Sequence, residues 1–200
     1  MLLSGGGRTL ENLAGHIAQG QLDAVIRVVI SSRPEAYELQ RAAKLAIPRH
    51  VVARKAHGDV AAHSAAVFEI LRRFEVDLVC QAGWLSMLRI PDDFLGRIIN
   101  IHPALLPSFG GTGMYGAHVH EAVLAAGCKV SGVTVHFADQ TYDTGPIILQ
   151  RCCPVREDDT PETLAARVFE QECIAYPEAI GLIAAGRVKV EDGRTRILSE

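Results

Sequence analysis

The chain has 200 residues, 48% of them apolar, and its 20 Lys and Arg against 23 Asp and Glu give a formal net charge of −3. This length allows one domain with a sizeable core and is marginal for two, and the slightly acidic balance argues against a nucleic-acid partner, which usually leaves a basic surface. No apolar stretch approaches the roughly 20 residues of a membrane span and no signal-peptide pattern opens the chain, so we expect a cytoplasmic protein without a membrane partner.

Apolar runs and helical patterns alternate along the first half of the chain. A three-residue apolar start leads into a glycine turn and then a helix with an apolar stripe from Leu10 to Ile17. Nearly unbroken apolar runs follow, as in strands buried on both faces, and helical patterns separate them. The expected strands are residues 23–32, 50–54, 76–83 and 97–102, and the expected helices are residues 34–46 and 58–74.

The second half has a different pattern. In residues 130–139 apolar and polar residues alternate more clearly, and residues 145–155 follow after a short turn. This pattern indicates mixed or antiparallel strands. Residues 160–186 predict a long helix that we expect to be bent or broken at Pro177.

Strands separated by helices imply crossover connections and therefore an α/β fold class. We predict a single domain over residues 1–200, with a doubly wound, mostly parallel sheet, helices on both faces and antiparallel strands in the C-terminal half. In open sheets of this type, ligands bind beyond the carboxyl ends of the strands.

The glycine turn "SGGGRT", Ser4 to Thr9, lies between the first strand and the first helix. Such a turn exposes backbone N–H groups at the positive end of a helix, which favours an anion. Its spacing matches neither a P-loop nor a dinucleotide-binding loop. We therefore expect a phosphate that is not part of a dinucleotide, with a merely tight turn as the alternative.

The stretch "NIHPALLPSFGG" ends an apolar strand in two polar residues, Asn100 and His102. Residues two apart on a strand project to the same face, so the two side chains should lie side by side. An Asn amide donates without changing charge and a His can carry a proton, so the pair could hold a developing oxyanion. A structural hydrogen-bonding pair is the alternative. Pro103 ends the ladder of strand hydrogen bonds, and Leu106-Pro107 is a candidate cis turn.

Two carboxylates are further candidates. Asp143 lies in a loop between two apolar strands, where it could reach inward and raise the pKa of an imidazole, although an Asp that shapes its own turn fits equally well. Glu172 has mainly apolar neighbours on its helical face, so it needs a partner or a ligand.

We expect no metal site. His118 and His120 would splay apart near a helix start, no third ligand is evident, and none of the five cysteines has a metal-ligand spacing. His136 shares a strand face with Thr134 and fits a supporting or a purely structural role equally well.

Taken together, these motifs resemble the folate-dependent formyltransferases. The stretches "NIHPALLPSF", "GVTVHF" and "YDTGPIILQ" carry the resemblance, which extends over nearly the whole chain. Within that family the chain is similar to the phosphoribosylglycinamide formyltransferases of purine synthesis. The resemblance implies the formyltransferase fold and transfer of the formyl group of 10-formyltetrahydrofolate to the amine of glycinamide ribonucleotide, with no metal.

The resemblance also implies roles for particular residues. The catalytic residues would be Asn100, His102 and Asp143. Backbone groups of Gly7, Arg8 and Thr9 would bind the substrate phosphate. Glu172 would bind the substrate. The folate would be held by Leu85, Ser86, Met87, Leu88 and Asn100. Asn100 and a protonated His102 would stabilise the developing oxyanion, and Asp143 would keep His102 protonated.

Relatives with the same catalytic core are alternatives, although formyltetrahydrofolate hydrolases and methionyl-tRNA formyltransferases usually carry an extra domain and sugar-nucleotide formyltransferases tend to be longer. A dinucleotide-dependent oxidoreductase would fit the fold but not the glycine spacing. An inactive binding protein would require that Asn100, His102 and Asp143 do not converge. The glycine-rich loop after Pro107 is expected to cover the site, and the sequence does not distinguish a monomer from a homodimer.

Overall fold

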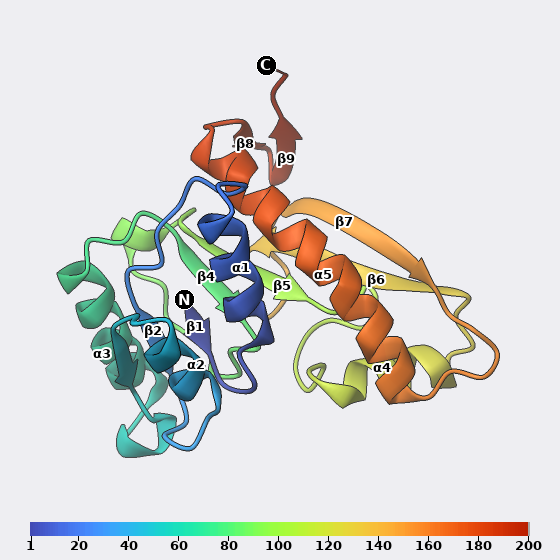
Figure 1. Ribbon diagram of the computed structural model, residues 1–200, viewed down its shortest axis with the longest axis horizontal. Helices are drawn as coiled ribbons and strands as arrows, with labels where there is room; N and C mark the ends of the chain where they lie inside the picture. The colour runs from blue at the N-terminus through green and yellow to red at the C-terminus, as the bar shows by residue number, and fades with distance from the viewer. Residues whose placement is uncertain (200) are drawn as a thin grey trace. The chain divides into compact units, whose positions relative to one another are not determined.

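The computed structural model describes residues 1–199 (Figure 1), and the chain forms two compact units, residues 1–99 and residues 100–200. A seven-stranded sheet has the strand order β3-β2-β1-β4-β5-β6-β7, and β8 and β9 form a separate two-stranded sheet. The expected α/β class, with a mostly parallel sheet and antiparallel strands near the C-terminus, is confirmed. Strand β5 (Ile98–His102) carries Asn100 and His102, so the ordering of the sheet determines where these two side chains lie.

Parallel strands make up the sheet of the first unit. Leu2 of β1 is paired with Ile30 on one side and Gln81 on the other, and β2 is paired in parallel with β3. The elements of this unit, in chain order, are β1 (Leu2–Leu3), α1 (Arg8–Ala18), β2 (Val29–Ser31), α2 (Glu38–Lys44), β3 (Arg49–Val51), η1 (Arg54–Ala56), α3 (Val60–Arg73), β4 (Val79–Ala82) and η2 (Asp92–Phe94).

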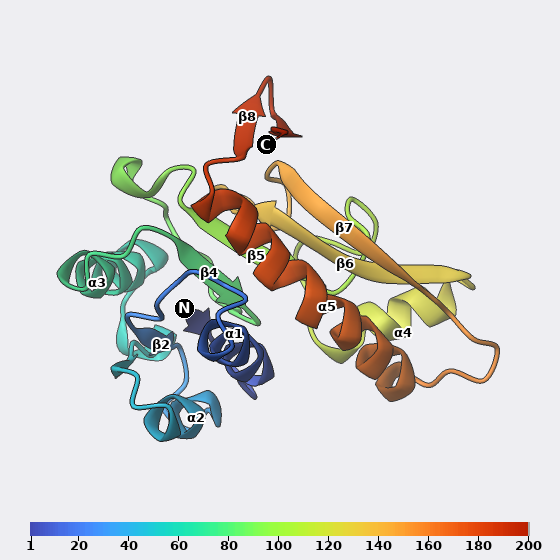
Figure 2. The same ribbon diagram turned by 45° about the horizontal axis from the view of Figure 1, so that its top comes forward.

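Helices lie on both sides of these strands. Figure 2 shows α1 on one side of β1 and β2 and α3 on the other. Helix α3 begins after Asp59, whose carboxylate accepts a hydrogen bond from the N–H of Ala62 at 2.8 Å and so satisfies a free helix-terminal donor. Val67 and Leu71, four residues apart on this helix, are buried, and Ile70 and Phe74 on the same face are half-buried. The 3.6-residue period therefore identified the face that packs on the strands.

In the second unit a long antiparallel pair lies beneath a long helix. The pair is β6 (Val130–Phe137) and β7 (Ile147–Pro154), and α5 (Pro161–Ala184) lies across both strands in Figure 1. Helix α4 (Ala117–Ala125) packs against α5. The expected break at Pro177 is wrong, because α5 runs through this residue as one helix.

Two further elements differ from the sequence-based expectation. The strand expected over residues 23–32 is confined to Val29–Ser31, and Val25 is 76% exposed, so β-branched composition alone overestimated its length. The hairpin of β8 (Val188–Glu191) and β9 (Arg194–Ile197) was not predicted. Its turn is Asp192-Gly193, both with positive φ, and an Asp-Gly pair is a strong hairpin signal that should have identified it.

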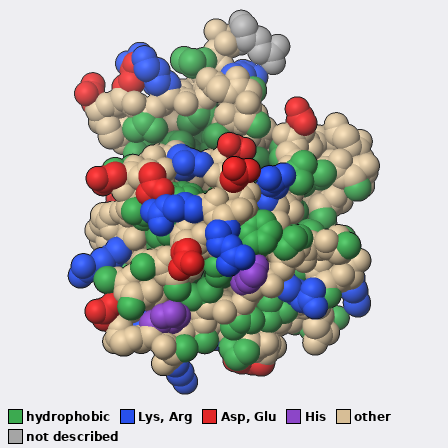
Figure 3. All heavy atoms as spheres, turned by 90° about the vertical axis from the view of Figure 1, so that its left-hand side faces the viewer, with side chains coloured by type: hydrophobic (Ala, Val, Ile, Leu, Met, Phe, Trp, Pro, Cys, Tyr) green, Lys and Arg blue, Asp and Glu red, His purple; other side chains and the backbone are tan. Residues whose placement is uncertain are grey.

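The surface carries both signs of charge. On the face drawn in Figure 3, Lys and Arg side chains are interspersed with Asp and Glu. None of the helices within residues 1–199 is long and apolar enough to cross a membrane.

Candidate active site

The carboxyl end of β5 presents its two polar residues to one carboxylate. The Asn100 Nδ2 atom lies 3.4 Å from Oδ1 of Asp143, and the Nδ1 atom of His102 lies 3.5 Å from Oδ2 of the same residue. The two-residue spacing thus places both side chains on one face of the strand, as expected. Asn100, His102 and Asp143, which are far apart in the sequence, converge in the second unit.

The loop between β6 and β7 positions Asp143. Asp143 has a φ of 59°, in the left-handed region that Asp tolerates better than most residues. Two residues later, a Cβ atom added to Gly145 would lie 1.9 Å from the carbonyl oxygen of Phe137, so only glycine fits the close approach of the two strand ends. Asp139 accepts from the N–H of Thr141 at 2.8 Å and closes the start of the loop.

Two more groups contact the Asp143 carboxylate. The Nε2 atom of His136 lies 3.5 Å from Oδ1, and the N–H of Gly111 donates to Oδ2 at 2.9 Å. The structure therefore places His136 within the site, where the sequence left its role open. Gly111 was missed, because nothing in its local sequence marks a backbone donor to a residue 32 positions away.

The orientation of the Asn100 amide follows from the two side chains beside its nitrogen. The Nδ1 atom of His136 faces the carbonyl oxygen of Phe137 at 2.8 Å and must carry a hydrogen to bond it. The Nδ2 atom of Asn100 lies 3.2 Å from the Nε2 atom of His136 and donates to Oδ1 of Asp143 at 3.4 Å, because a carboxylate oxygen only accepts. The amide nitrogen of Asn100 therefore points toward both His136 and Asp143.

His102 is buried and held at both ring nitrogens. Its Nε2–H donates to the carbonyl oxygen of Phe109 at 2.8 Å, while Nδ1 faces Asp143. Phe109 has a φ of 55°, a backbone conformation that costs an aromatic residue about 1–3 kcal/mol and that often marks functional sites. This strained residue directs its carbonyl group at the imidazole.

Burial and charge act in opposite directions on the two titratable groups. Burial lowers the pKa of His102, and the Asp143 charge and the Phe109 carbonyl only partly offset this effect. Asp143 was expected to keep His102 protonated, but burial lowers the pKa of His102 by more than the Asp143 charge raises it. Burial also raises the pKa of Asp143, but His136, His102 and the Gly111 N–H together hold it below its ordinary value. Asp143 is therefore ionised near neutral pH.

A turn supported by β6 follows His102. The peptide bond Leu106-Pro107 is cis, which confirms the expected cis turn. The hydroxyl group of Thr134 donates to the carbonyl oxygen of Ala104 at 2.7 Å and accepts from the N–H of Leu106 at 3.0 Å. Gln150 of β7 donates to this hydroxyl and to the carbonyl oxygen of Leu106, both at 2.9 Å. These hydrogen bonds hold the chain just beyond β5.

The glycine turn of the first unit leads directly into α1. Gly7 is the residue before the helix, its φ is 75°, and no side chain caps the helix start. Arg8 is exposed and Thr9 is buried, at the first two positions of the helix. The positive end of an eleven-residue helix without a side-chain cap can attract an anion such as phosphate.

The remaining predicted binding residues lie in both units. Residues 85–88 follow β4 without helix or strand structure; Leu88 is buried and the other three are half-buried. Such an irregular, partly buried segment can offer main-chain groups and apolar side chains to a flat heterocycle. Glu172 is half-buried on α5.

His118 and His120 do not act together. His118 is exposed and its Nδ1 atom lies 3.2 Å from Glu121, whereas His120 is buried. Within the described part of the chain, no group of three His, Cys, Asp or Glu side chains is arranged to hold a metal ion.

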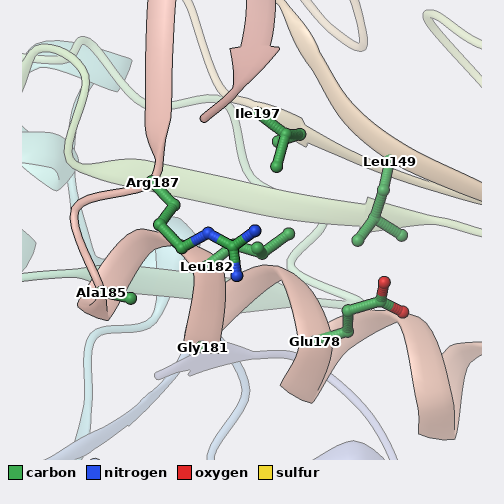
Figure 4. Close-up of a pocket in the computed structure, with 7 residues that line it drawn as sticks. All are labelled: Leu149, Glu178, Gly181, Leu182, Ala185, Arg187 and Ile197. Carbon is green, nitrogen blue, oxygen red and sulfur yellow. The ribbon is translucent and has the colours of Figure 1, made fainter. Parts of the chain in front are cut away.

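A groove of about 510 Å³ lies elsewhere in the second unit (Figure 4). Leu149 of β7, Leu182 of α5 and Ile197 of β9 form part of its lining. It contains none of the residues that surround Asp143, so it is not part of the candidate active site.

Comparison with known proteins identifies the family. The family model described as formyl transferase matches residues 1–180. The chain belongs to this family. It is 37% identical over 198 residues to the chloroplastic phosphoribosylglycinamide formyltransferase of Arabidopsis thaliana, covering 96% of this chain and 68% of that protein. The resemblance found in the sequence is therefore confirmed.

Other proteins similar to this formyl transferase have related names. The structure of glycinamide ribonucleotide transformylase 1 from Symbiobacterium toebii matches with a TM-score of 0.92 and 40% identity, covering 99% of this chain and 92% of that one. The trifunctional purine biosynthetic protein adenosine-3 of Gallus gallus is 40% identical over 192 residues. The match covers 95% of this chain but only 19% of that relative, so the chain spans about a fifth of the trifunctional protein's length.

Proposed function

We propose that this formyl transferase moves the formyl group of 10-formyltetrahydrofolate to the amine of glycinamide ribonucleotide, a step of purine biosynthesis. The single observation that carries the proposal is the position of the Asp143 carboxylate between His102 and His136, with the Asn100 amide beside it. Family membership supports the substrates, since relatives are named phosphoribosylglycinamide formyltransferase.

Asn100 and His102 would stabilise the transition state, and His102 would do so by exchanging its Nε2–H bond with the Phe109 carbonyl for one with the substrate. As the amine attacks the formyl carbon, negative charge develops on the formyl oxygen, and preorganised donors at such a site are worth roughly 3–4 kcal/mol each. The 3.4 Å contact from Asn100 to Asp143 is longer than its contact to His136, so we expect the substrate to replace it. Developing negative charge also raises the pKa of His102, which counteracts the effect of burial.

Asp143 would assist proton movement. Its carboxylate contacts His102 and can accept a proton from the attacking nitrogen directly or through one water. The same proton would then pass to N10 of tetrahydrofolate as the bond between N10 and the formyl carbon breaks. His136 would hold Asp143 and Asn100 in position. No covalent intermediate or metal is part of this proposal.

Binding groups outside this cluster would orient the reactants. The backbone of Gly7, Arg8 and Thr9 would bind the substrate phosphate, and Glu172 would bind the ribonucleotide. Formyltetrahydrofolate supplies the formyl group, and the half-buried segment 85–88 and Asn100 would hold it. Binding energy at the phosphate then lowers the entropic part of the barrier at the amine. We further propose a cytoplasmic enzyme without nucleic-acid or membrane partners, active as a monomer or homodimer.

The test is formyl transfer followed by absorbance, with and without glycinamide ribonucleotide, for wild type and Asp143→Asn. We expect turnover that requires the ribonucleotide and falls by about 10²- to 10⁴-fold in the variant, the usual contribution of a positioned proton-transfer group. Asp158→Asn removes the same charge from an exposed position and should retain full activity.

Two results would contradict the proposal. Turnover without any acceptor would indicate a hydrolase. Full activity of Asp143→Asn would show that the cluster around this carboxylate does not carry the chemistry.

A further inference from the structure

A buried acid lies directly behind the glycine turn. Glu38, the first residue of α2, is 0% exposed, and its N–H donates to the carbonyl oxygen of Gly5 at 3.3 Å. A Cβ atom added to Gly7 would lie 2.6 Å from the Cβ atom of Glu38. The side chain thus packs against the backbone that is proposed to bind phosphate.

The carboxyl group of Glu38 is only partly satisfied. Its Oε1 atom accepts from the hydroxyl group of Ser31 at 2.9 Å, whereas Oε2 is buried and has no hydrogen-bond partner among the described residues. Burial raises the pKa of Glu38, and the Ser31 hydroxyl group and the charge of Arg33 are among the effects that offset part of it. A neutral carboxylic acid suits this environment better than a carboxylate does.

Other charged groups around Glu38 come from neighbouring elements. Arg41, one turn further along α2, donates from Nε to the carbonyl oxygen of Gly6 at 2.8 Å and is ion-paired with Glu11 of α1. Arg33 follows β2, and Arg8 opens α1. Since Arg41 is already paired with an acid, ionised Glu38 would leave a second negative charge next to the turn.

We propose that Glu38 is a positioning residue whose carboxyl group must be protonated for the glycine turn to bind a phosphate dianion. This inference rests on the proposed function, because it assumes that the turn Gly5–Gly7 and the start of α1 bind the substrate phosphate. A buried carboxylate against this backbone would repel the dianion with little screening, and the protonated acid would not.

Binding of the dianion and protonation of Glu38 are then thermodynamically linked. Each favours the other by the same factor, and coupling of this type is commonly about 5- to 150-fold. The affinity of the glycine turn for the dianion should be high below the pKa of Glu38 and should fall as the pH rises through that pKa. Binding above that pKa should take up a proton.

The test uses inorganic sulfate, a dianion whose own charge does not change near neutral pH. Calorimetry gives its affinity at a series of pH values, and amide chemical shifts of residues 5–9 show whether it binds at the turn. We expect wild-type affinity to fall at least about fivefold with rising pH. Glu38→Gln should keep the high affinity at every pH. Glu35→Gln removes an exposed acid three residues before Glu38 and should behave as wild type.

Enzyme kinetics provide a second readout. In wild type the KM for glycinamide ribonucleotide should rise with pH more steeply than in Glu38→Gln, with kcat similar in both. If Glu38→Gln does not fold, proton uptake by wild type on sulfate binding, measured in buffers of different ionisation enthalpy, decides the question. Uptake supports the linkage, and its absence overturns it.

Two further outcomes would refute the proposed role of Glu38 but would not bear on the proposed formyl transfer. Parallel pH profiles of wild type and Glu38→Gln, or no sulfate binding at residues 5–9, refute the role of Glu38. Formyl transfer by the wild type, measured separately, shows whether the proposed function still holds.

Discussion

Replacing Thr134 by Val tests how the turn after His102 is held. Thr134 is fully buried on β6, and its hydroxyl group bonds Ala104, Leu106 and Gln150 at 2.7–3.0 Å. Val has nearly the same shape but no hydroxyl group, so all three hydrogen bonds are lost while the packing is retained.

The expected loss of stability follows from counting the groups left without a partner. Gln150 keeps its hydrogen bond to the carbonyl oxygen of Leu106. The carbonyl of Ala104 and the N–H of Leu106 lose their bonds, at about 1–3 kcal/mol each. The extra buried methyl group recovers about 0.8 kcal/mol, so the net loss is about 1–5 kcal/mol. A typical domain has only roughly 5–15 kcal/mol of stability in total.

Urea unfolding followed by circular dichroism measures this loss. A loss of about 3 kcal/mol lowers the midpoint by about 1 M if m is near 3 kcal/mol/M. Thr134→Ser keeps the hydroxyl group and should lose only about 1 kcal/mol, the cost of one buried methyl group. Thr112→Val, at an exposed position, should change stability by at most about 0.5 kcal/mol. If the Val variant at 134 were as stable as the Ser variant, the hydroxyl group would not support the turn.

Two further predictions concern the loop between β6 and β7, which contains Asp143 and Gly145. In Asp143→Asn, the pKa of His102 should move further below its ordinary value of about 6.5, because burial remains and the opposing carboxylate charge is gone; an NMR titration of the imidazole measures this, and an unchanged value would contradict the assigned contact. Gly145→Ala should destabilise the protein by about 3 kcal/mol, or a Tm decrease of about 6–12 °C, because the new Cβ atom would meet the backbone of Phe137. The control Gly58→Ala, where nothing lies within 4 Å of the added atom, should leave the Tm almost unchanged.

Local patterns in the sequence predicted much of the fold. Apolar runs and 3.6-residue stripes identified the buried strands and the helical faces, because these patterns depend on which residues contact the core. They did not identify element ends, as the short β2 shows. Pro177 within α5 shows that packing against β6 and β7 can outweigh a helix-breaking residue.

Residue type and position made Asn100, His102 and Asp143 candidates for a site, with structural roles as equally good alternatives. A strand end and a loop between strands are places where polar side chains gather, and the two-residue spacing placed the first two on one face. The resemblance to formyltransferases then gave these residues their expected roles, and the family is now shown.

Only the tertiary structure revealed what surrounds these residues. The carbonyl of Phe109 and the N–H of Gly111 reach His102 and Asp143 through left-handed backbone conformations that no side-chain pattern encodes. The burial that lowers the pKa of His102 likewise depends on packing from several elements. Glu38 is an ordinary helix residue in the sequence, and it becomes a buried acid behind the glycine turn only because folding brings Gly7 against it. The sequence determined which chemical groups are present, and long-range packing decided their charge, orientation and partners.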